Sequence, residues 1–208
     1  SMVLNGLINT QLVALCRSFG ISAIGIGGID GGLVQAHRRA PVTLASGEVV
    51  DYGLVGDIDG IDGTVITRLL DSGFLPVVSP LSCDNSGQLL NINADTVAAA
   101  IGGALVAEKL ILCTGAPGIL ERVDDPQSLI SYTDLAGLHR LREKGAISDG
   151  MLPKSSAIEA AIRGGVRRVH VISYTEADSL LAEIFTNEGK GTLVVADTKA
   201  LTAAEQGQ

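Results

Sequence analysis

The chain has 208 residues, a net charge of −8 and a sequence pI near 4.8, and 46% of its residues are hydrophobic. This is enough apolar material for one large domain or two small lobes, while the acidic balance argues against nucleic acid or an anionic membrane as the main partner. No apolar run has the length needed to span a bilayer. The cysteines Cys16, Cys83 and Cys113 are far apart, odd in number and without a metal-binding pattern, so we expect reduced, buried thiols and a cytoplasmic protein.

Apolar periodicity predicts alternating helices and strands in the first half of the chain. Residues 3–19 repeat at helical spacing and Gly20 follows them, so we expect a helix that ends there. Residues 33–37 and 51–57 are predicted to be two strands joined by a polar connection around Ser46 and Gly47. The other elements expected here are a strand at 22–26, a glycine-rich loop at 27–32, a helix at 64–71 and a strand at 75–80.

The same alternation continues in the second half. Strands are expected at 88–93, 109–113, 166–173 and 191–195. Helices are expected from 94 to about 108 and at 133–144, 151–163 and 176–185. Gly102 and Gly103 lie inside the first of these helices, where each costs about 1 kcal/mol relative to Ala, which indicates close packing. The alternation predicts an α/β fold with a mostly parallel sheet and an aliphatic core.

Two amides and a carboxylate lie where a predicted strand passes into a helix. Asn91 and Asn93 alternate with apolar residues and Asp95 opens the helix, so all three fall on one side. In open α/β sheets, ligands bind at the carboxyl ends of strands, which makes this stretch a candidate site. The alternative is that Asn93 or Asp95 caps the helix, because both residue types are favoured there.

Other segments have the composition of an anion site. Residues 114–118, Thr-Gly-Ala-Pro-Gly, end a strand in a turn whose exposed N–H groups suit a nucleotide phosphate or ribose, or form an ordinary turn. Lys154 falls in the first turn of a helix, where it either faces a bound phosphate or is a solvated surface lysine. The loop at 27–32 is a substrate or structural loop, and the three scattered histidines form no metal triad.

Several segments, taken in order, resemble the amino acid kinase family, in particular its acetylglutamate kinase members. The most specific are Asn-Ile-Asn-Ala-Asp at 91–95, Lys-Leu-Ile-Leu-Cys-Thr at 109–114, Pro-Gly-Ile-Leu at 117–120 and Gly-Met-Leu-Pro-Lys at 150–154. Others are Gly-Gly-Ile-Asp-Gly at 27–31, Tyr-Gly-Leu-Val-Gly-Asp-Ile at 52–58 and Gly-Phe-Leu-Pro-Val-Val at 73–78. The resemblance therefore extends along nearly the whole chain.

This resemblance implies a three-layer αβα sandwich with the carbamate kinase-like fold. Residues 1–80 would be the remainder of an acyl-amino-acid lobe with a β-hairpin excursion, and residues 81–208 a nucleotide lobe. The implied reaction moves the γ-phosphoryl group of ATP, which brings Mg²⁺ with it, to the side-chain carboxylate of N-acetyl-L-glutamate in arginine synthesis. The implied partners are these small molecules and further copies in a homo-oligomer, with no nucleic acid, no membrane and no metal held by the protein itself.

The resemblance also implies a role for each residue of the matching motifs. Lys154 would stabilise charge on the transferring phosphoryl group and Asp95 would orient the catalytic lysines. Asn91 and Asn93 would bind the substrate. The implied nucleotide-binding positions are Thr114, Gly115, Ala116, Pro117, Gly118, Ile119, Leu120, Ala146, Ile147, Ser148 and Met151.

Several family features are not found in the sequence. The family's opening Lys-x-Gly-Gly strand, His-Gly-Gly-Gly loop and substrate-gripping Arg are missing, so we expect an N-terminally truncated fold. Gly115 stands where the family has Asp, Ile29 where it has Lys, and residues 173–175 are Ser-Tyr-Thr in place of Asp-Gly-Arg. Two alternatives therefore stay open: a non-catalytic nucleotide-binding or regulatory relative, and a kinase for a related acylated amino acid such as an aminoadipate derivative.

Overall fold

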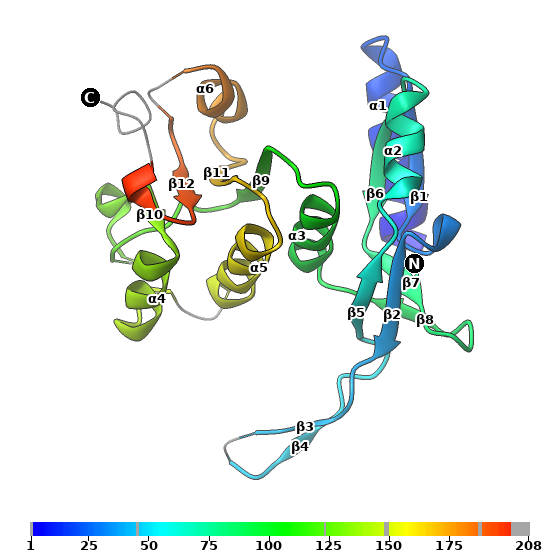
Figure 1. Cartoon of the computed structure of the whole chain (residues 1–208), viewed down its shortest axis with the longest axis horizontal. Coiled ribbons are helices and arrows are strands. Elements are labelled where there is room, and N and C mark those ends of the chain that lie inside the picture. The colour runs from blue at the N-terminus through cyan, green and yellow to red at the C-terminus, as the bar shows by residue number, and fades with distance from the viewer. Residues whose placement is uncertain (1, 45, 123, 148–149, 187–188, 201–208) are drawn as a thin grey trace. The chain divides into compact units, whose positions relative to one another are not determined.

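The computed structural model describes residues 2–44, 46–122, 124–147, 150–186 and 189–200. The chain divides into two compact units, Ser1–Val97 and Ala98–Gln208 (Figure 1). The sequence predicts a boundary between two functional lobes at residues 80 and 81, whereas the first compact unit continues to Val97. Residues 81–97, expected in the nucleotide lobe, therefore lie in the first compact unit. Within the described residues, no helix combines the length and the apolar character that crossing a membrane requires.

The first unit is built on two parallel strands, β1 (Ala23–Gly27) and β6 (Leu75–Ser79), against which α1 (Asn9–Ser18) and α2 (Thr64–Asp71) pack. Asn9 attaches α1 to this pair, because its buried side-chain Nδ2 donates to the carbonyl oxygen of Val77 at 2.8 Å. The predicted helix at 3–19 begins as a π-helix, η1 (Met2–Ile8), and ends as expected before Gly20, whose φ is 73°. The bounds predicted for α2 are confirmed.

Antiparallel pairs complete the first unit. They are β2 (Val34–Arg38) with β5 (Gly56–Ile61), β3 (Val42–Thr43) with β4 (Val49–Val50), and β7 (Leu81–Cys83) with β8 (Leu89–Asn91), and the short helix η2 (Asp30–Gly32) precedes β2. The second strand of this predicted pair exists, but its predicted bounds of 51–57 are wrong, because only Gly56 and Asp57 of that range belong to β5. The Asp51 carboxylate accepts from the Gly53 N–H at 2.8 Å and from Arg38 Nη2 at 2.7 Å, so this stretch turns and the partner of β2 begins later.

The second unit contains a four-stranded sheet in the order β10-β12-β11-β9. Its strands are β9 (Lys109–Thr114), β10 (Tyr132–Asp134), β11 (Arg168–Ser173) and β12 (Thr192–Val195). Its helices are η3 (Pro126–Ser128), α4 (Leu135–Glu143), α5 (Met151–Arg163), α6 (Ser179–Phe185) and η4 (Thr198–Ala200). β11 runs parallel to β9 and β12 runs parallel to β10, whereas β11 and β12 are antiparallel. The core is aliphatic, with Ile158, Val169 and Val194 each 0% exposed, and the predicted α/β class is confirmed.

The helix α3 (Ala94–Ala104) carries the chain from the first unit into the second. It was expected to continue to about residue 108, which is wrong. Val106 has a left-handed φ of 48° and the Ala107 N–H bonds back to the Gly102 carbonyl oxygen at 2.8 Å, which closes the helix. The predicted close packing is confirmed, because a Cβ at Gly103 would lie 3.3 Å from the Gly164 carbonyl oxygen.

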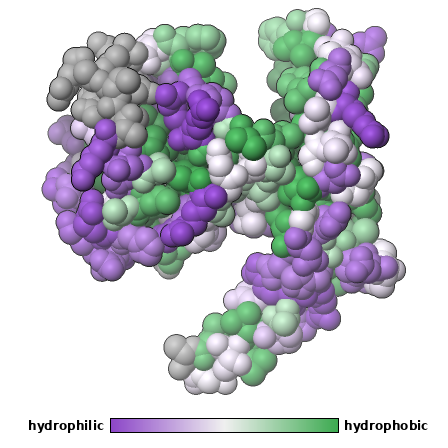
Figure 2. All heavy atoms as spheres, viewed as in Figure 1, coloured by the Kyte–Doolittle hydropathy of each residue, from purple (hydrophilic) through white to green (hydrophobic). Residues whose placement is uncertain are grey.

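The cysteines and the apolar side chains of α1 are both more exposed than a buried core position would be. The cysteines are free, but the prediction that they are buried is wrong: Cys113 is exposed because it alternates with buried Leu112 along β9. Apolar side chains of α1 are also exposed, with Leu15 at 54% and the adjoining Phe19 at 75%. Figure 2 shows hydrophobic surface over the end of the first unit where Figure 1 labels α1.

Candidate functional site

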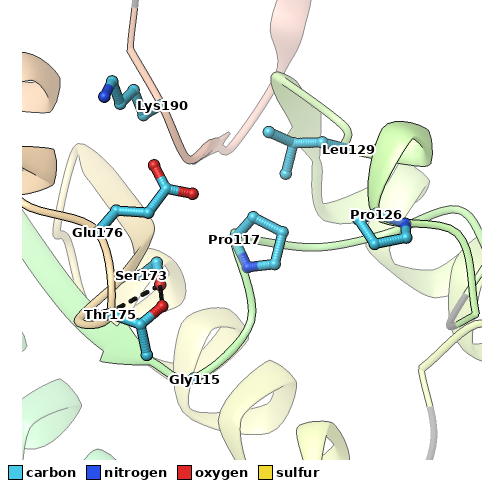
Figure 3. A pocket seen from close by; sticks show the side chains of 8 residues that line it. All are labelled: Gly115, Pro117, Pro126, Leu129, Ser173, Thr175, Glu176 and Lys190. Carbon is cyan, nitrogen blue, oxygen red and sulfur yellow. Dashed lines mark hydrogen bonds between the residues drawn. The ribbon is translucent and has the colours of Figure 1, made fainter.

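A cavity of about 550 Å³ opens in the second unit where β9 and β11 end. These strands are parallel neighbours, and Thr114 pairs with Ser173, so the loops after both strands leave the sheet at the same edge. Figure 3 shows polar side chains on one side of this cavity and apolar side chains on the other. The lining residues are Gly115, Pro117, Pro126, Leu129, Ser173, Thr175, Glu176 and Lys190.

The turn after β11 is held by its own hydroxyl groups. Ser173 Oγ lies 2.8 Å from Thr175 Oγ1 and accepts from the Thr175 N–H at 3.1 Å (Figure 3). Ser179 Oγ donates to the Ser173 carbonyl oxygen at 2.6 Å, and the Tyr174 N–H donates to the Thr114 carbonyl oxygen at 2.9 Å. These bonds hold the turn that places Ser173, Thr175 and Glu176 along the polar side of the cavity.

Gly115 lies close to the side chain of Tyr174. The hydroxyl of Tyr174 lies 3.1 Å from the position that a Cβ on Gly115 would occupy. A larger side chain at 115 therefore requires the phenol to move. The sequence departs from the family pattern at both positions, and the structure brings them into contact.

The loop after β9 is anchored by Thr192 of β12. Thr192 is 0% exposed, and its Oγ1 accepts from the Ile119 N–H at 2.8 Å. A Cβ on Gly118 would lie 2.6 Å from that same oxygen, so only glycine fits there without a shift. The predicted residues Gly118 and Ile119 thus lie beneath the loop, while Gly115 and Pro117 line the cavity.

A buried hydrogen-bonded pair, His170 and Glu183, fixes the backbone beside Lys190 at the opposite rim. His170 Nδ1 lies 2.7 Å from Glu183 Oε1, and Glu183 Oε2 accepts from the Gly191 N–H at 3.0 Å. Burial raises the pKa of Glu183, but the bonds from His170 and from the backbone N–H groups of Gly191 and Lys190 outweigh it, so the pKa is lowered overall. An ionised carboxylate therefore holds the chain that carries Lys190 to the cavity.

The remaining nucleotide positions predicted from the sequence mostly support the cavity region from within the core. Ile147 is buried, and Ala146 and Met151 pack against the same core cluster. Leu120 forms an isolated β-bridge with Leu129, Thr114 ends β9, and Ala116 lies between two lining residues. Ser148 lies outside the described residues.

Lys154 lies in the first turn of α5, as predicted, and is half-buried. The first position of this helix follows Gly150, which provides no side-chain cap. A cation at a helix start opposes the helix dipole, which is compensated when an anion binds nearby. The position is therefore suited to a phosphate group.

Asn91, Asn93 and Asp95 belong to the first unit and are placed there by β8 and α3. Asn91 ends β8, and its N–H donates to the Leu54 carbonyl oxygen at 2.9 Å. Asn93 Oδ1 accepts from the Thr96 N–H at 3.1 Å, so the capping alternative is confirmed for this residue. Asp95 lies in the first turn of α3, where a carboxylate is favourable. In the loop at 27–32, the Gly27 N–H donates to Asp30 Oδ2 at 2.7 Å. This bond closes the loop and gives Asp30 a structural role.

Sequence reasoning missed the half of the cavity that comes from β11 and from the chain before β12. Thr175, Glu176 and Lys190 line it, yet they belong to no motif that we singled out as a site. The signal was present in the order of elements, because a loop that follows a strand parallel to β9 reaches the same sheet edge. Within the described residues, no group of three or more His, Cys, Asp or Glu side chains is placed to hold a metal ion.

Comparison with known proteins shows which family the chain resembles in sequence. A model of the amino acid kinase family matches residues 1–173. The chain is 44% identical to a Myxococcus xanthus protein named acetylglutamate kinase, and the match spans 99% of this chain and 68% of that protein.

Solved structures show the same fold. A Streptococcus mutans protein is 28% identical with a TM-score of 0.74, over 94% of this chain and 70% of that one. A Giardia carbamate kinase is 16% identical with a TM-score of 0.62, again over 94% of this chain and 70% of that one, which bears on the fold alone. The predicted carbamate kinase-like fold is confirmed, and the chain belongs to the amino acid kinase family.

Proposed function

We propose that the chain is an acetylglutamate kinase-type phosphotransferase, which moves the γ-phosphoryl group of ATP to the side-chain carboxylate of N-acetyl-L-glutamate in arginine biosynthesis. The observation that carries the proposal is the cavity where β9 and β11 end, in a chain 44% identical to a protein named for this reaction. In open α/β sheets this edge is where ligands bind.

The nucleotide is proposed to bind in the second unit. A cavity of about 550 Å³ has room for a ligand of this size, and its mixed walls suit a base and a ribose. Gly115 and Pro117 place backbone rather than long side chains on the β9 side. Lys154 at the start of α5 would neutralise charge on the transferring phosphoryl group, and Mg²⁺ would enter bound to the nucleotide.

The acceptor is proposed to bind through the first unit. Asn91 would hold the acylated amino acid by hydrogen bonds, together with Nδ2 of Asn93, whose Oδ1 caps α3. Asp95 is proposed as a catalytic residue, in keeping with the role that the family resemblance implies. A carboxylate oxygen of the acceptor attacks the γ-phosphorus, the bond from that phosphorus to the bridging oxygen of ADP breaks, and an acyl phosphate forms. Such a transfer depends mainly on positioning and on cations, which is why Lys154 and Mg²⁺ matter more than a nucleophile of the protein.

The relatives' shared name favours this proposal over a non-catalytic relative. Proteins named acetylglutamate kinase from Methanopyrus kandleri and Myxococcus xanthus each match more than nine-tenths of the chain at 44% identity. A kinase for an acylated aminoadipate would share the nucleotide site and differ only in the acceptor. Parallel assays with ATP and either N-acetyl-L-glutamate or N-acetyl-aminoadipate separate these two acceptors.

The first test is calorimetric titration of the 208-residue chain with Mg-ADP. We expect binding that weakens by about 10- to 100-fold in Lys154→Ala, because a hydrogen-bonded cation is lost from the phosphate site. Lys144→Ala is the matched control, since Lys144 is exposed at the end of α4. A cooperatively folded chain that binds no Mg-ADP refutes the nucleotide assignment.

We further propose that the protein is a cytoplasmic homo-oligomer that uses the apolar face of α1 as an interface. Leu12, Leu15 and Phe19 are 45%, 54% and 75% exposed, which is a large apolar surface for one short helix. Light scattering after size exclusion measures the mass directly. A chain that stays monomeric at high concentration contradicts the proposal.

A further inference from the structure

One guanidinium connects α4 to the start of α5. Arg142, in the last turn of α4, donates from Nε to Ser155 Oγ at 2.9 Å and from Nη1 to Glu159 Oε2 at 2.7 Å. Ser155 directly follows Lys154 and is 0% exposed. Arg142 therefore holds α5 at two successive turns, the first of which carries the proposed phosphate-binding lysine.

Ser155 passes this constraint to the beginning of the helix. Its hydroxyl accepts from Arg142 and donates to the Leu152 carbonyl oxygen at 3.0 Å. The first turn of a helix has free backbone N–H groups and frays unless something holds it. Gly150 supplies no side-chain cap to α5, and the bonds through Arg142 and Ser155 instead tie the Leu152 carbonyl oxygen of this first turn to the end of α4.

The arrangement is mostly shielded from water. The side chains of Arg142 and Glu159 are 20% and 19% exposed, so their attraction is weakly screened. The hydrogen bond from Arg142, the largest effect, lowers the pKa of Glu159, and Arg163 adds to it while burial opposes it. Arg142 Nη2 is buried and has no hydrogen-bond acceptor in the part of the chain that the structure describes.

We infer that Arg142 is a positioning residue, which orders the first turn of α5 and thereby sets the place of Lys154. The link to catalysis rests on the proposed function of Lys154, whereas the ordering of the turn does not. Arg163 provides a comparison within the same network: it also bonds Glu159, at 3.0 Å, but it lies at the far end of α5 and is 65% exposed.

Amide hydrogen exchange tests the ordering. In a helix the N–H groups of Ser155 and Ser156 bond to the carbonyls of Met151 and Leu152, so their exchange reports on the first turn. We expect Arg142→Met to speed their exchange by about tenfold relative to the Val171 amide of the core strand β11. Arg163→Met should leave this ratio unchanged, and Arg142→Lys should restore part of the protection because it keeps one charged donor. An equal change at Val171 and in the first turn, or no change, overturns the inference.

Mg-ADP affinity tests the consequence for Lys154. We expect Arg142→Met to weaken binding in the otherwise unchanged chain and to have no added effect in Lys154→Ala, because both act through one group. Equal losses in both backgrounds overturn the connection to Lys154. If the unchanged chain binds no Mg-ADP, the proposed function fails, while the exchange experiment still decides whether Arg142 orders the turn.

Discussion

The Thr192 hydroxyl provides a direct test of how the cavity loop is held. Thr192→Val keeps the side-chain shape but replaces Oγ1, which accepts from the Ile119 N–H at 2.8 Å, with a methyl group. Thr192 and Ile119 are 0% and 1% exposed, so water cannot replace the lost acceptor. An unsatisfied buried donor costs about 1–3 kcal/mol. For a chain of this length that corresponds to a fall of about 2–12 °C in Tm.

Hydrogen exchange separates this effect from ordinary loss of packing. Thr192→Ser keeps the hydroxyl and loses one buried methyl group, which costs about 1 kcal/mol. Both variants are therefore expected to melt earlier, but only Thr192→Val should expose the Ile119 amide to faster exchange. Because the anchored loop carries Gly115 and Pro117, Mg-ADP affinity should also fall more in Thr192→Val. An Ile119 amide that is equally protected in both variants refutes the reasoning.

Three further substitutions test other supports of the two units. Glu183→Gln should lower the free energy of unfolding at neutral pH, because folding lowers the pKa of Glu183 and so favours its ionised form. In urea unfolding, the difference in this free energy between the variant and the unchanged chain should shrink as the pH falls below the ordinary value of 4.5. Gly191→Ala should cost about 1–3 kcal/mol in the same measurement, because its Cβ overlaps the carbonyl oxygen of Val171. Asn9→Ala should cost about 1 kcal/mol, since the bond from Nδ2 to the Val77 carbonyl oxygen at 2.8 Å is lost; a Tm equal to that of the unchanged chain contradicts this.

Local patterns predicted the fold where local forces decide it. The bounds of α2 and α5 follow from apolar spacing and from the glycines after them, and the structure has them at Thr64–Asp71 and Met151–Arg163. The errors occur where side chains or tertiary contacts override the pattern. Asp51 turns a stretch that alternates like a strand, and the left-handed Val106 ends α3 earlier than its composition suggests.

The candidate site could be predicted only in part for the same reason. Lys154 and the loop after β9 are continuous motifs, so their positions could be identified from the sequence. The opposite wall of the cavity joins Thr175 and Glu176 to Lys190, which a helix separates from them in the sequence and only the sheet order brings close. Arg142 was missed because its partners lie on another helix, and no spacing rule connects residues across two helices.

The contact between Tyr174 and Gly115 changes how the departures from the family pattern should be weighed. From the sequence, a glycine in place of the usual Asp favours a non-catalytic relative, because a polar group is lost from the nucleotide loop. In the structure the space beside Gly115 is taken by the Tyr174 hydroxyl, 3.1 Å from where a Cβ would lie. Tyr174 belongs to another departure, the Ser-Tyr-Thr stretch at 173–175, so the folded chain brings two of the departures into contact. Gly115 still lines the cavity beside Pro117, so the loop after β9 reaches the proposed nucleotide site without an Asp at this position, and Gly115 alone does not argue against nucleotide binding.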